Sequence, residues 1–162
     1  MKLIAEFLFY LIVIIVIYFL IRNVFGIGRN TFSIKRINEL FKKIDKKYEA
    51  FLKKKVHNVF LTKDNYKREI EKIADLCMTV LKPQIDGIYA LVRLKAKPDG
   101  GINFSSKHFE GVIAITEALL IRDTRTHKLT EKDKKEFYLA FKENMVSDIT
   151  ERIYINEEEI DQ

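Results

Sequence analysis

Apolar residues dominate the start of the chain and leave no polar face. Residues 7–21 (FLFYLIVIIVIYFLI) contain no charged side chain, and the run extends back to Leu3 with Glu6 as its single interruption. The 19 residues from Leu3 onward would rise about 28 Å as a helix, close to the roughly 30 Å hydrocarbon layer of a bilayer. A helix on the surface of a soluble domain would show a polar side. The pattern predicts an uncleaved N-terminal transmembrane helix that anchors the chain.

Two other interpretations of this run stay open. Gly26 and Gly28 have the small-x-small spacing of a signal-peptide cleavage site, although the run is longer and its basic start weaker than in most signals. A helix buried inside a protein core would also be apolar on all sides. We favour the anchor because the run has the length that spans a bilayer.

Basic residues around the run set its expected orientation. Lys2 is the one basic residue before it, and four follow it closely, namely Arg22, Arg29, Lys35 and Arg36. Lys and Arg concentrate on the cytoplasmic side of membrane helices. We therefore expect a single-pass membrane protein with a cytoplasmic C-terminal domain, in the inner or plasma membrane if the cell is bacterial. The single cysteine, which excludes an internal disulfide, fits a reducing compartment.

After the run, the pattern changes to a helical period. Within residues 33–55 one apolar stripe, at alternating steps of four and three, is formed by Ile37, Phe41, Ile44, Tyr48 and Phe51. Such spacing keeps side chains on one face of a helix. After residue 41 the other faces carry seven lysines, namely Lys42, Lys43, Lys46, Lys47, Lys53, Lys54 and Lys55. The sequence predicts an amphipathic helix with a basic outer face, directly beside the membrane.

The middle of the chain allows two interpretations. A second helix can begin at Thr62–Asp64, and Pro83 should end or kink it because proline lacks an amide hydrogen and clashes with the preceding turn. A further helix should then run to about Leu94, followed by a loop. The alternative is a short β-hairpin around residues 90–104, where apolar and basic residues alternate before the turn sequence KPDGG.

Capping signals mark two more helices near the C-terminus. Ser105 or Ser106 can cap a helix with an apolar inner face, and Thr130 with Asp133 has the spacing of a capping box. The fold class predicted is all-α: one transmembrane helix, then a compact soluble bundle of four to five helices.

Charge is distributed unevenly along the chain. Residues 22–55 carry eleven basic and three acidic side chains, whereas residues 74–162 carry 13 basic and 16 acidic ones. The net charge of +6 is thus concentrated near the predicted anchor. We expect three segments: residues 1–29 as anchor and hinge, residues 30–155 as a helical cytoplasmic domain, and residues 156–162 as an acidic, frayed tail.

No cluster of residues carries an obvious chemistry. The three histidines, His57, His108 and His127, each lack another histidine or a cysteine nearby, so no metal-ligand spacing is present. Cys77 falls on the apolar stripe of its helix, as a buried core residue does. Ser105–His108 (SSKH) is better explained as a helix start than as a catalytic group. The sequence predicts no catalytic, cofactor-binding or metal site, and no enzyme.

A one-pass anchor with a small helical domain is a form found in accessory and regulatory subunits of membrane assemblies, and in exclusion or immunity-type proteins. We therefore expect a non-enzymatic, membrane-tethered interaction module that acts from the cytoplasmic side. Its seven lysines would contact a cytosolic protein, another membrane protein or anionic lipid headgroups. A second interpretation is that they bind no partner and only keep the outer face of the helix in contact with water. The alternative is a membrane-anchored nucleic-acid-binding protein that uses helix 33–55. The apolar stripe also permits a homodimer through a short coiled coil.

Overall fold

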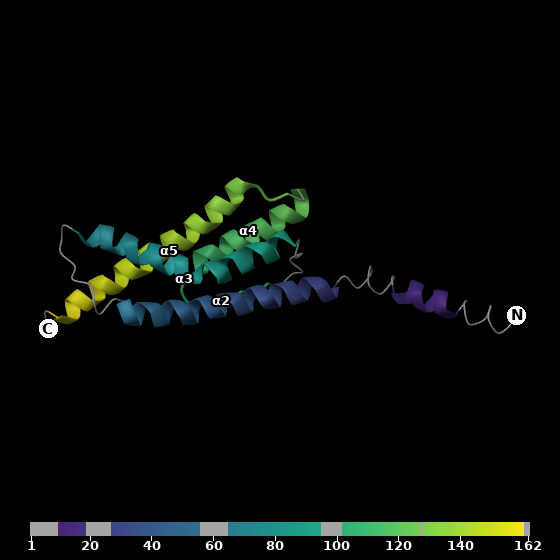
Figure 1. Cartoon of the computed structure of the whole chain (residues 1–162), viewed down its shortest axis with the longest axis horizontal. Helices are drawn as coiled ribbons and strands as arrows, with labels where there is room; N and C mark the ends of the chain where they lie inside the picture. The colour runs from purple at the N-terminus through teal and green to yellow at the C-terminus, as the bar shows by residue number, and fades with distance from the viewer. Residues whose placement is uncertain (1–9, 19–26, 56–64, 95–101, 127, 161–162) are drawn as a thin grey trace, which may run out of the picture.

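The computed structural model describes residues 10–18, 27–55, 65–94, 102–126 and 128–160. Its long helices are α2 (Ile27–Lys55), α3 (Tyr66–Arg93), α4 (Glu110–Thr126) and α5 (Glu131–Ile160). Helices α2 and α5 run in broadly one direction, and α3 and α4 return in the other (Figure 1). The predicted helical bundle is therefore confirmed for the described part of the chain.

The apolar stripe of α2 forms one wall of the core. Ile37, Phe41, Ile44 and Tyr48 are fully buried, while Phe51 is only partly covered. Helix α3 lies against this stripe at a short distance: a Cβ atom built on Gly87 would lie 3.1 Å from a methyl group of Leu40. The predicted buried face of α2 is confirmed. Because Gly87 of α3 has no side chain, the two helices approach each other closely at this point.

Phenylalanine rings join the other helices to this wall. Phe141 of α5 lies at the centre, with its ring centroid 6.3 Å from that of Phe41, 5.4 Å from that of Phe109 and 5.2 Å from that of Phe137. Stacked, tilted and edge-on ring pairs of this kind add about 0.5–1.5 kcal/mol each beyond the area they bury. One continuous apolar core therefore connects α2, α4 and α5.

Pro83 neither ends nor divides its helix, since α3 continues through it to Arg93. Proline has no amide hydrogen to donate to the carbonyl of Thr79, which costs about 3 kcal/mol in a helix interior. Both residues are exposed, so water can serve that carbonyl. Leu81 and Ile85, on either side of the proline, are buried in the same core. Packing on both sides outweighs the local break, so the two helices expected here are one.

The β-hairpin alternative is wrong for the described residues. Residues 90–93 belong to α3, residues 102–109 have no regular structure until α4 begins, and no strand occurs in the described part of the chain. Residues 95–101, which hold the turn sequence, lie outside it. Phe104 is buried, and its ring packs against that of Phe41 with centroids 5.9 Å apart. This contact turns the connecting segment toward α2.

The capping box before α5 is confirmed in detail. The amide of Thr130 donates to a carboxylate oxygen of Asp133 at 2.7 Å, and the amide of Asp133 donates to the Thr130 hydroxyl at 3.2 Å. Aspartate has a shorter side chain than the usual glutamate, yet it closes the reciprocal pair. Helix α5 then continues to Ile160, so most of the predicted acidic tail, residues 156–160, is helical.

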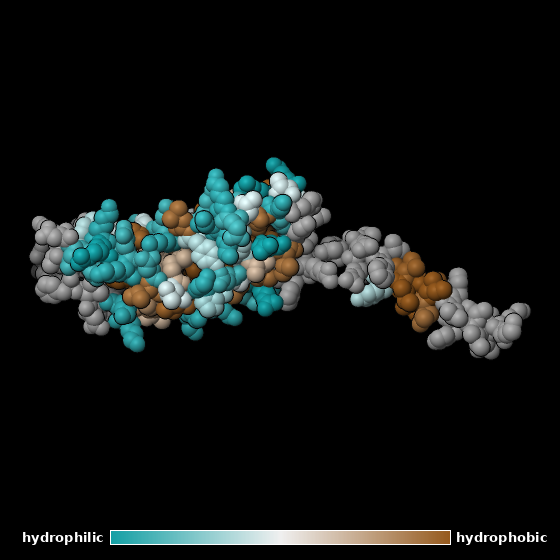
Figure 2. Space-filling model, turned by 45° about the horizontal axis from the view of Figure 1, so that its top comes forward, coloured by the Kyte–Doolittle hydropathy of each residue, from teal (hydrophilic) through white to brown (hydrophobic). Residues whose placement is uncertain are grey.

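The transmembrane prediction is wrong for the part of the chain that the structure describes. Only residues 10–18 of the predicted span are described, and they form an exposed helical stretch whose apolar surface is brown in Figure 2. These nine residues rise about 14 Å, half of a hydrocarbon layer. No helix among the described residues is both long and apolar enough to cross a bilayer. The rest of residues 3–21 lies outside that part.

The single-pass topology and the membrane localisation depended on that span and are corrected with it. The hinge expected after the anchor changes too, because α2 already begins at Ile27 and includes residues 27–30. Residues 27–55 are thus one long helix, and the bend expected at residues 27–30 is absent.

Candidate interaction surfaces

A polar edge of α2 holds the segment that leads into α4. The side-chain oxygen of Asn38 accepts the amide of Ser105 at 2.9 Å and the hydroxyl of Ser105 at 3.2 Å. One carboxylate oxygen of Asp45 accepts the hydroxyl of Ser106 at 2.9 Å, and the other accepts the amide of Lys107 at 3.0 Å. Residues 105–107 thus exchange hydrogen bonds to water for bonds to one edge of α2.

Ser106 is the residue that caps the start of the next helix. Its hydroxyl oxygen accepts the amides of Phe109 at 3.0 Å and His108 at 3.3 Å, one turn before Glu110 opens α4. The sequence left Ser105 and Ser106 as equal candidates. Ser106 serves because Asp45 accepts its hydroxyl hydrogen, which leaves the oxygen lone pairs for the two amides.

An ion-pair network continues this edge to α5. Arg152 donates to Glu49 at 2.7 Å and lies 2.9 Å from Asp148, whose carboxylate accepts the Tyr48 hydroxyl at 2.8 Å. The hydrogen bond from Arg152 holds the pKa of Glu49 below its usual range. Burial, and secondarily the Asp148 carboxylate, raise the pKa of Tyr48. The network ties the C-terminal half of α2 to α5.

His108 fills the centre of this network. Its Nε2 atom lies 2.9 Å from a carboxylate oxygen of Glu49 without the alignment of a hydrogen bond, and its Nδ1 atom lies 3.2 Å from Arg152. Its side chain is only 6% exposed. The imidazole therefore packs among charged groups of two helices, in a structural position. No group of His, Cys, Asp and Glu that could hold a metal occurs among the described residues.

The remaining sequence candidates for chemistry are one cysteine and two histidines. Cys77 is buried in the core as expected, and burial raises the pKa of its thiol to about 12. A thiol in that state is mostly uncharged and a poor nucleophile near neutral pH. His57 and His127 lie outside the described residues.

The seven lysines between residues 42 and 55 of α2, from here the lysine face, are all exposed. In the described part of the chain no ion pair joins any of six of them to a carboxylate, namely Lys42, Lys43, Lys46, Lys47, Lys53 and Lys55. Two of the acidic residues of the same helix, Asp45 and Glu49, lie between the lysine face and the buried stripe and bind other elements. Six of these seven lysines therefore form a cationic surface that no ion pair among the described residues neutralises.

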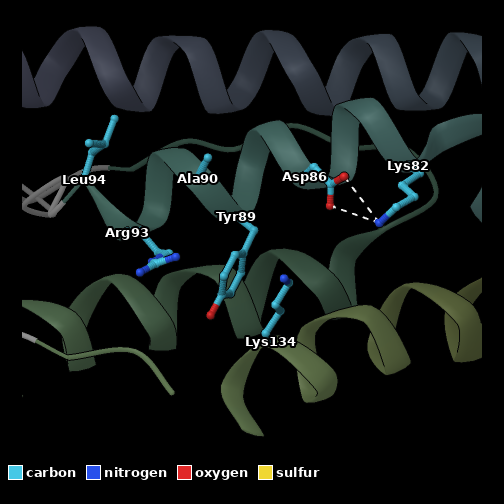
Figure 3. Close-up of a pocket in the computed structure, with 7 residues that line it drawn as sticks. All are labelled: Lys82, Asp86, Tyr89, Ala90, Arg93, Leu94 and Lys134. Atoms are coloured by element: carbon cyan, nitrogen blue, oxygen red, sulfur yellow. Dashed lines mark hydrogen bonds and ion pairs between the residues drawn. The ribbon is translucent and has the colours of Figure 1, made fainter. Parts of the chain in front are cut away.

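A second cationic surface, not anticipated from the sequence, lies between α3 and α5. A hollow of about 560 Å³ is lined by Lys82, Asp86, Tyr89, Ala90, Arg93, Leu94 and Lys134 (Figure 3). In that view Tyr89 and Lys134 point into the space between the two helices, and Lys82 pairs with Asp86. The Tyr89 hydroxyl lies 3.4 Å from the carbonyl oxygen of Thr130, which joins the hollow to the start of α5.

A neighbouring hollow extends this surface along α5. It measures about 520 Å³ and is lined by Asp75, Met78, Lys82, Glu131, Lys134, Lys135, Tyr138, Leu139 and Lys142. Lys82 and Lys134 line both hollows, so the two form one surface, from here the α3–α5 groove. The sequence did not predict this surface because its basic residues fall within residues 74–162, where acidic side chains outnumber basic ones.

Comparisons with known proteins supply no relative: no family model, no curated protein and no solved structure matches this chain.

Proposed function

We propose that this chain is a non-enzymatic interaction module that binds an acidic protein surface through the lysine face of α2. The contrast between the carboxylates and the lysines of α2 carries the proposal. Asp45 and Glu49 are engaged by residues 106–107 and by Arg152, whereas no ion pair within the described part of the chain engages six members of the lysine face. An exposed cationic surface of this kind attracts anionic partners and selects against cationic ones.

The lysines are arranged in two rows along the helix axis. Lys42, Lys46 and Lys53 form one row, and Lys43, Lys47 and Lys54 form the other. Steps of four and then seven residues place neighbours in each row about 6 Å and about 10.5 Å apart along the axis. Each exposed Lys–carboxylate pair contributes only about 0.2–1 kcal/mol. A partner therefore needs several carboxylates in a matching line, which favours an acidic helix or a rigid acidic surface over a single charged residue.

Nucleic acid is the competing ligand for the same face. Phosphates would also pair with two rows of lysines, and binding would weaken steeply with salt. No second basic element of the described chain lies beside α2 to grip the opposite strand, and residues 74–162 are acidic in sum. We therefore favour a protein partner and use nucleic acid as a defined outcome of the test.

The test measures fluorescence anisotropy of two labelled probes, an acidic glutamate-rich peptide and a DNA duplex of similar charge, at low and at physiological salt. The variant carries Lys42→Glu, Lys43→Glu, Lys46→Glu and Lys47→Glu. The matched control reverses four exposed basic residues elsewhere, Lys67→Glu, Arg125→Glu, Lys128→Glu and Lys132→Glu. We expect the variant to lose about tenfold or more in affinity for the peptide, with the control close to wild type.

Three results would contradict the proposal. Equal losses in the variant and the control mean that net charge alone attracts the peptide. Tighter binding of the duplex than of the peptide, lost in the variant only, assigns the lysine face to nucleic acid. Binding of neither probe at low salt leaves the lysine face as a hydrated surface.

A further inference from the structure

The α3–α5 groove differs from the lysine face because it combines cations with apolar contact area. Lys82 pairs with Asp86 at 3.4 Å, and Lys142 pairs with Asp75 at 2.7 Å. Among the described residues no ion pair engages the other basic residues of the groove, namely Arg93, Lys134 and Lys135. The groove therefore keeps cationic side chains available along its length.

The apolar part of the groove lies between these cations. Met78 and Tyr138 are partly covered, and Leu139 is 53% exposed. The Lys82 ammonium lies 5.1 Å from the centre of the Tyr138 ring, so its aliphatic stem extends the apolar surface. At the Arg93 end, Leu94 is 71% exposed. An occupant would thus bury leucine and methionine side chains in the middle and meet cations on both sides.

The shape of the groove suits a helix. Helices α3 and α5 run in opposite directions and cross obliquely (Figure 1), and residues of both line the two hollows, which leave a furrow into which the ridge of a third helix can pack. From Asp75 to Arg93 the groove follows α3 for 19 residues, so these two residues lie about 27 Å apart along the axis at the rise of an α-helix. An occupant of about five turns would fill it.

We propose that the α3–α5 groove binds an amphipathic, acidic helix of a partner protein. Apolar residues on one side of that helix, at helical spacing, would cover Leu139, Met78 and Tyr138, in the helix-in-groove mode of recognition. Glutamates and aspartates on its flanks would pair with Lys134 and Arg93. The groove and the lysine face share no residue, so this site is independent of the function proposed above.

The test uses a labelled synthetic helix with leucines along one side and glutamates on both flanks. A peptide of the same composition in scrambled order keeps the charge and loses the apolar side. Leu139→Glu puts an acid on the apolar floor, and Lys134→Glu removes a cation shared by both hollows. Matched controls are Ile121→Glu, an exposed apolar residue of α4, and Lys132→Glu, an exposed lysine of α5 outside the groove.

We expect the amphipathic peptide to bind more tightly than its scrambled form. Leu139→Glu and Lys134→Glu should each weaken it about tenfold or more, and both controls should leave it unchanged. The fourfold lysine-face variant should also bind it like wild type, which separates the two sites. Circular dichroism of each variant shows whether the fold is intact.

Several outcomes would overturn this proposal. Equal binding of the scrambled peptide shows attraction by charge alone. Unchanged binding in Leu139→Glu places the peptide elsewhere. A wild-type chain that sediments as a dimer, and becomes a monomer in Leu139→Glu, assigns the groove to a second copy of this chain. No binding of the peptide at low salt rejects an acidic helix as the occupant.

Discussion

On one side of α2 the polar residues are committed to other elements, and on the other side they face water. Asn38, Asp45 and Glu49 adjoin the buried stripe, and each binds residues 105–108 or Arg152. The lysine face borders them, since Lys46 and Lys53 stand three and four residues from Glu49, and it is exposed throughout. Two carboxylates of α2, Asp45 and Glu49, thus stabilise the fold, whereas Glu39 and the lysine face are exposed to water.

Distance from the apolar stripe explains the difference. A polar residue at the border of the core loses hydration on folding and must find a hydrogen-bond partner. A lysine on the far side keeps its hydration and gains little from an exposed ion pair. Substitutions on the inner side should therefore lower the stability of the fold, and substitutions on the outer side should leave it almost unchanged.

Among the substitutions that remove contacts to the inner side of α2, Arg152→Ala should lower the free energy of unfolding most. Its guanidinium serves Glu49 at 2.7 Å and Asp148 at 2.9 Å, and its loss leaves two half-buried carboxylates close to each other. Hydrogen bonds to charged groups contribute about 1.5–3 kcal/mol, so the free energy of unfolding should fall by about that amount. Urea denaturation followed by circular dichroism measures it. The exposed Arg125→Ala is the control, and a loss equal to that of the control contradicts the network's role.

Asp45→Ala should come next in effect. The substitution removes the acceptors of the Ser106 hydroxyl and of the Lys107 amide, both of which prepare the start of α4. Loss of a cap-like carboxylate costs about 1–2 kcal/mol. Glu39→Ala changes an exposed acid of the same helix and should stay within about 0.5 kcal/mol of wild type. If both variants lose the same stability, the inner and outer sides of α2 do not differ.

The sequence predicted those features that depend on local periodicity. The α2 stripe follows from steps of three and four, the Thr130–Asp133 box from a fixed spacing, and the burial of Cys77 from its place on a stripe. Each needs only residues within one helix or one turn. These predictions were confirmed because tertiary packing acted in the same direction as the local pattern.

Other features depend on contacts between distant segments, and local patterns misjudged or missed them. Pro83 has helix-breaking chemistry, but burial on both of its sides maintains α3. Asn38 binds Ser105, which lies 67 residues away in the sequence, and no local sequence pattern around either residue predicts this contact. The α3–α5 groove likewise joins residues on two helices that are far apart in sequence. The prediction for residues 7–21 rests on composition alone, which does not fix the extent of a helix.

Low pH should remove the stability that Glu49, on the inner side of α2, contributes to the fold. Because the hydrogen bond from Arg152 lowers the pKa of Glu49 in the folded chain, this group contributes stability above its unfolded pKa of about 4.3. The contribution is lost as the pH falls through the lower, folded pKa. Glu49→Gln should therefore cost about 1 kcal/mol near neutral pH and converge with wild type in acid. Urea denaturation across this range measures it, and a constant difference at all pH values would contradict the assignment. Glu39→Gln should follow wild type throughout.

Lys47→Glu should have the smallest effect on stability, and with the opposite sign. Lys43 and Lys47 stand four residues apart on an exposed face, where like charges repel by about 0.2–0.5 kcal/mol. Replacing one of them with glutamate exchanges repulsion for attraction, so the free energy of unfolding should rise by a few tenths of a kcal/mol. High salt should erase the gain because exposed charges are screened.

The same substitution should weaken binding of the acidic peptide to the lysine face. If the free energy of unfolding rises when Lys47 loses its positive charge, then the folded state does not depend on that charge. Urea denaturation at low and high salt, with peptide binding measured on the same samples, checks both halves. A fall in stability comparable to that of Asp45→Ala would show that Lys47 serves the fold, and the two sides of α2 would then not be distinct.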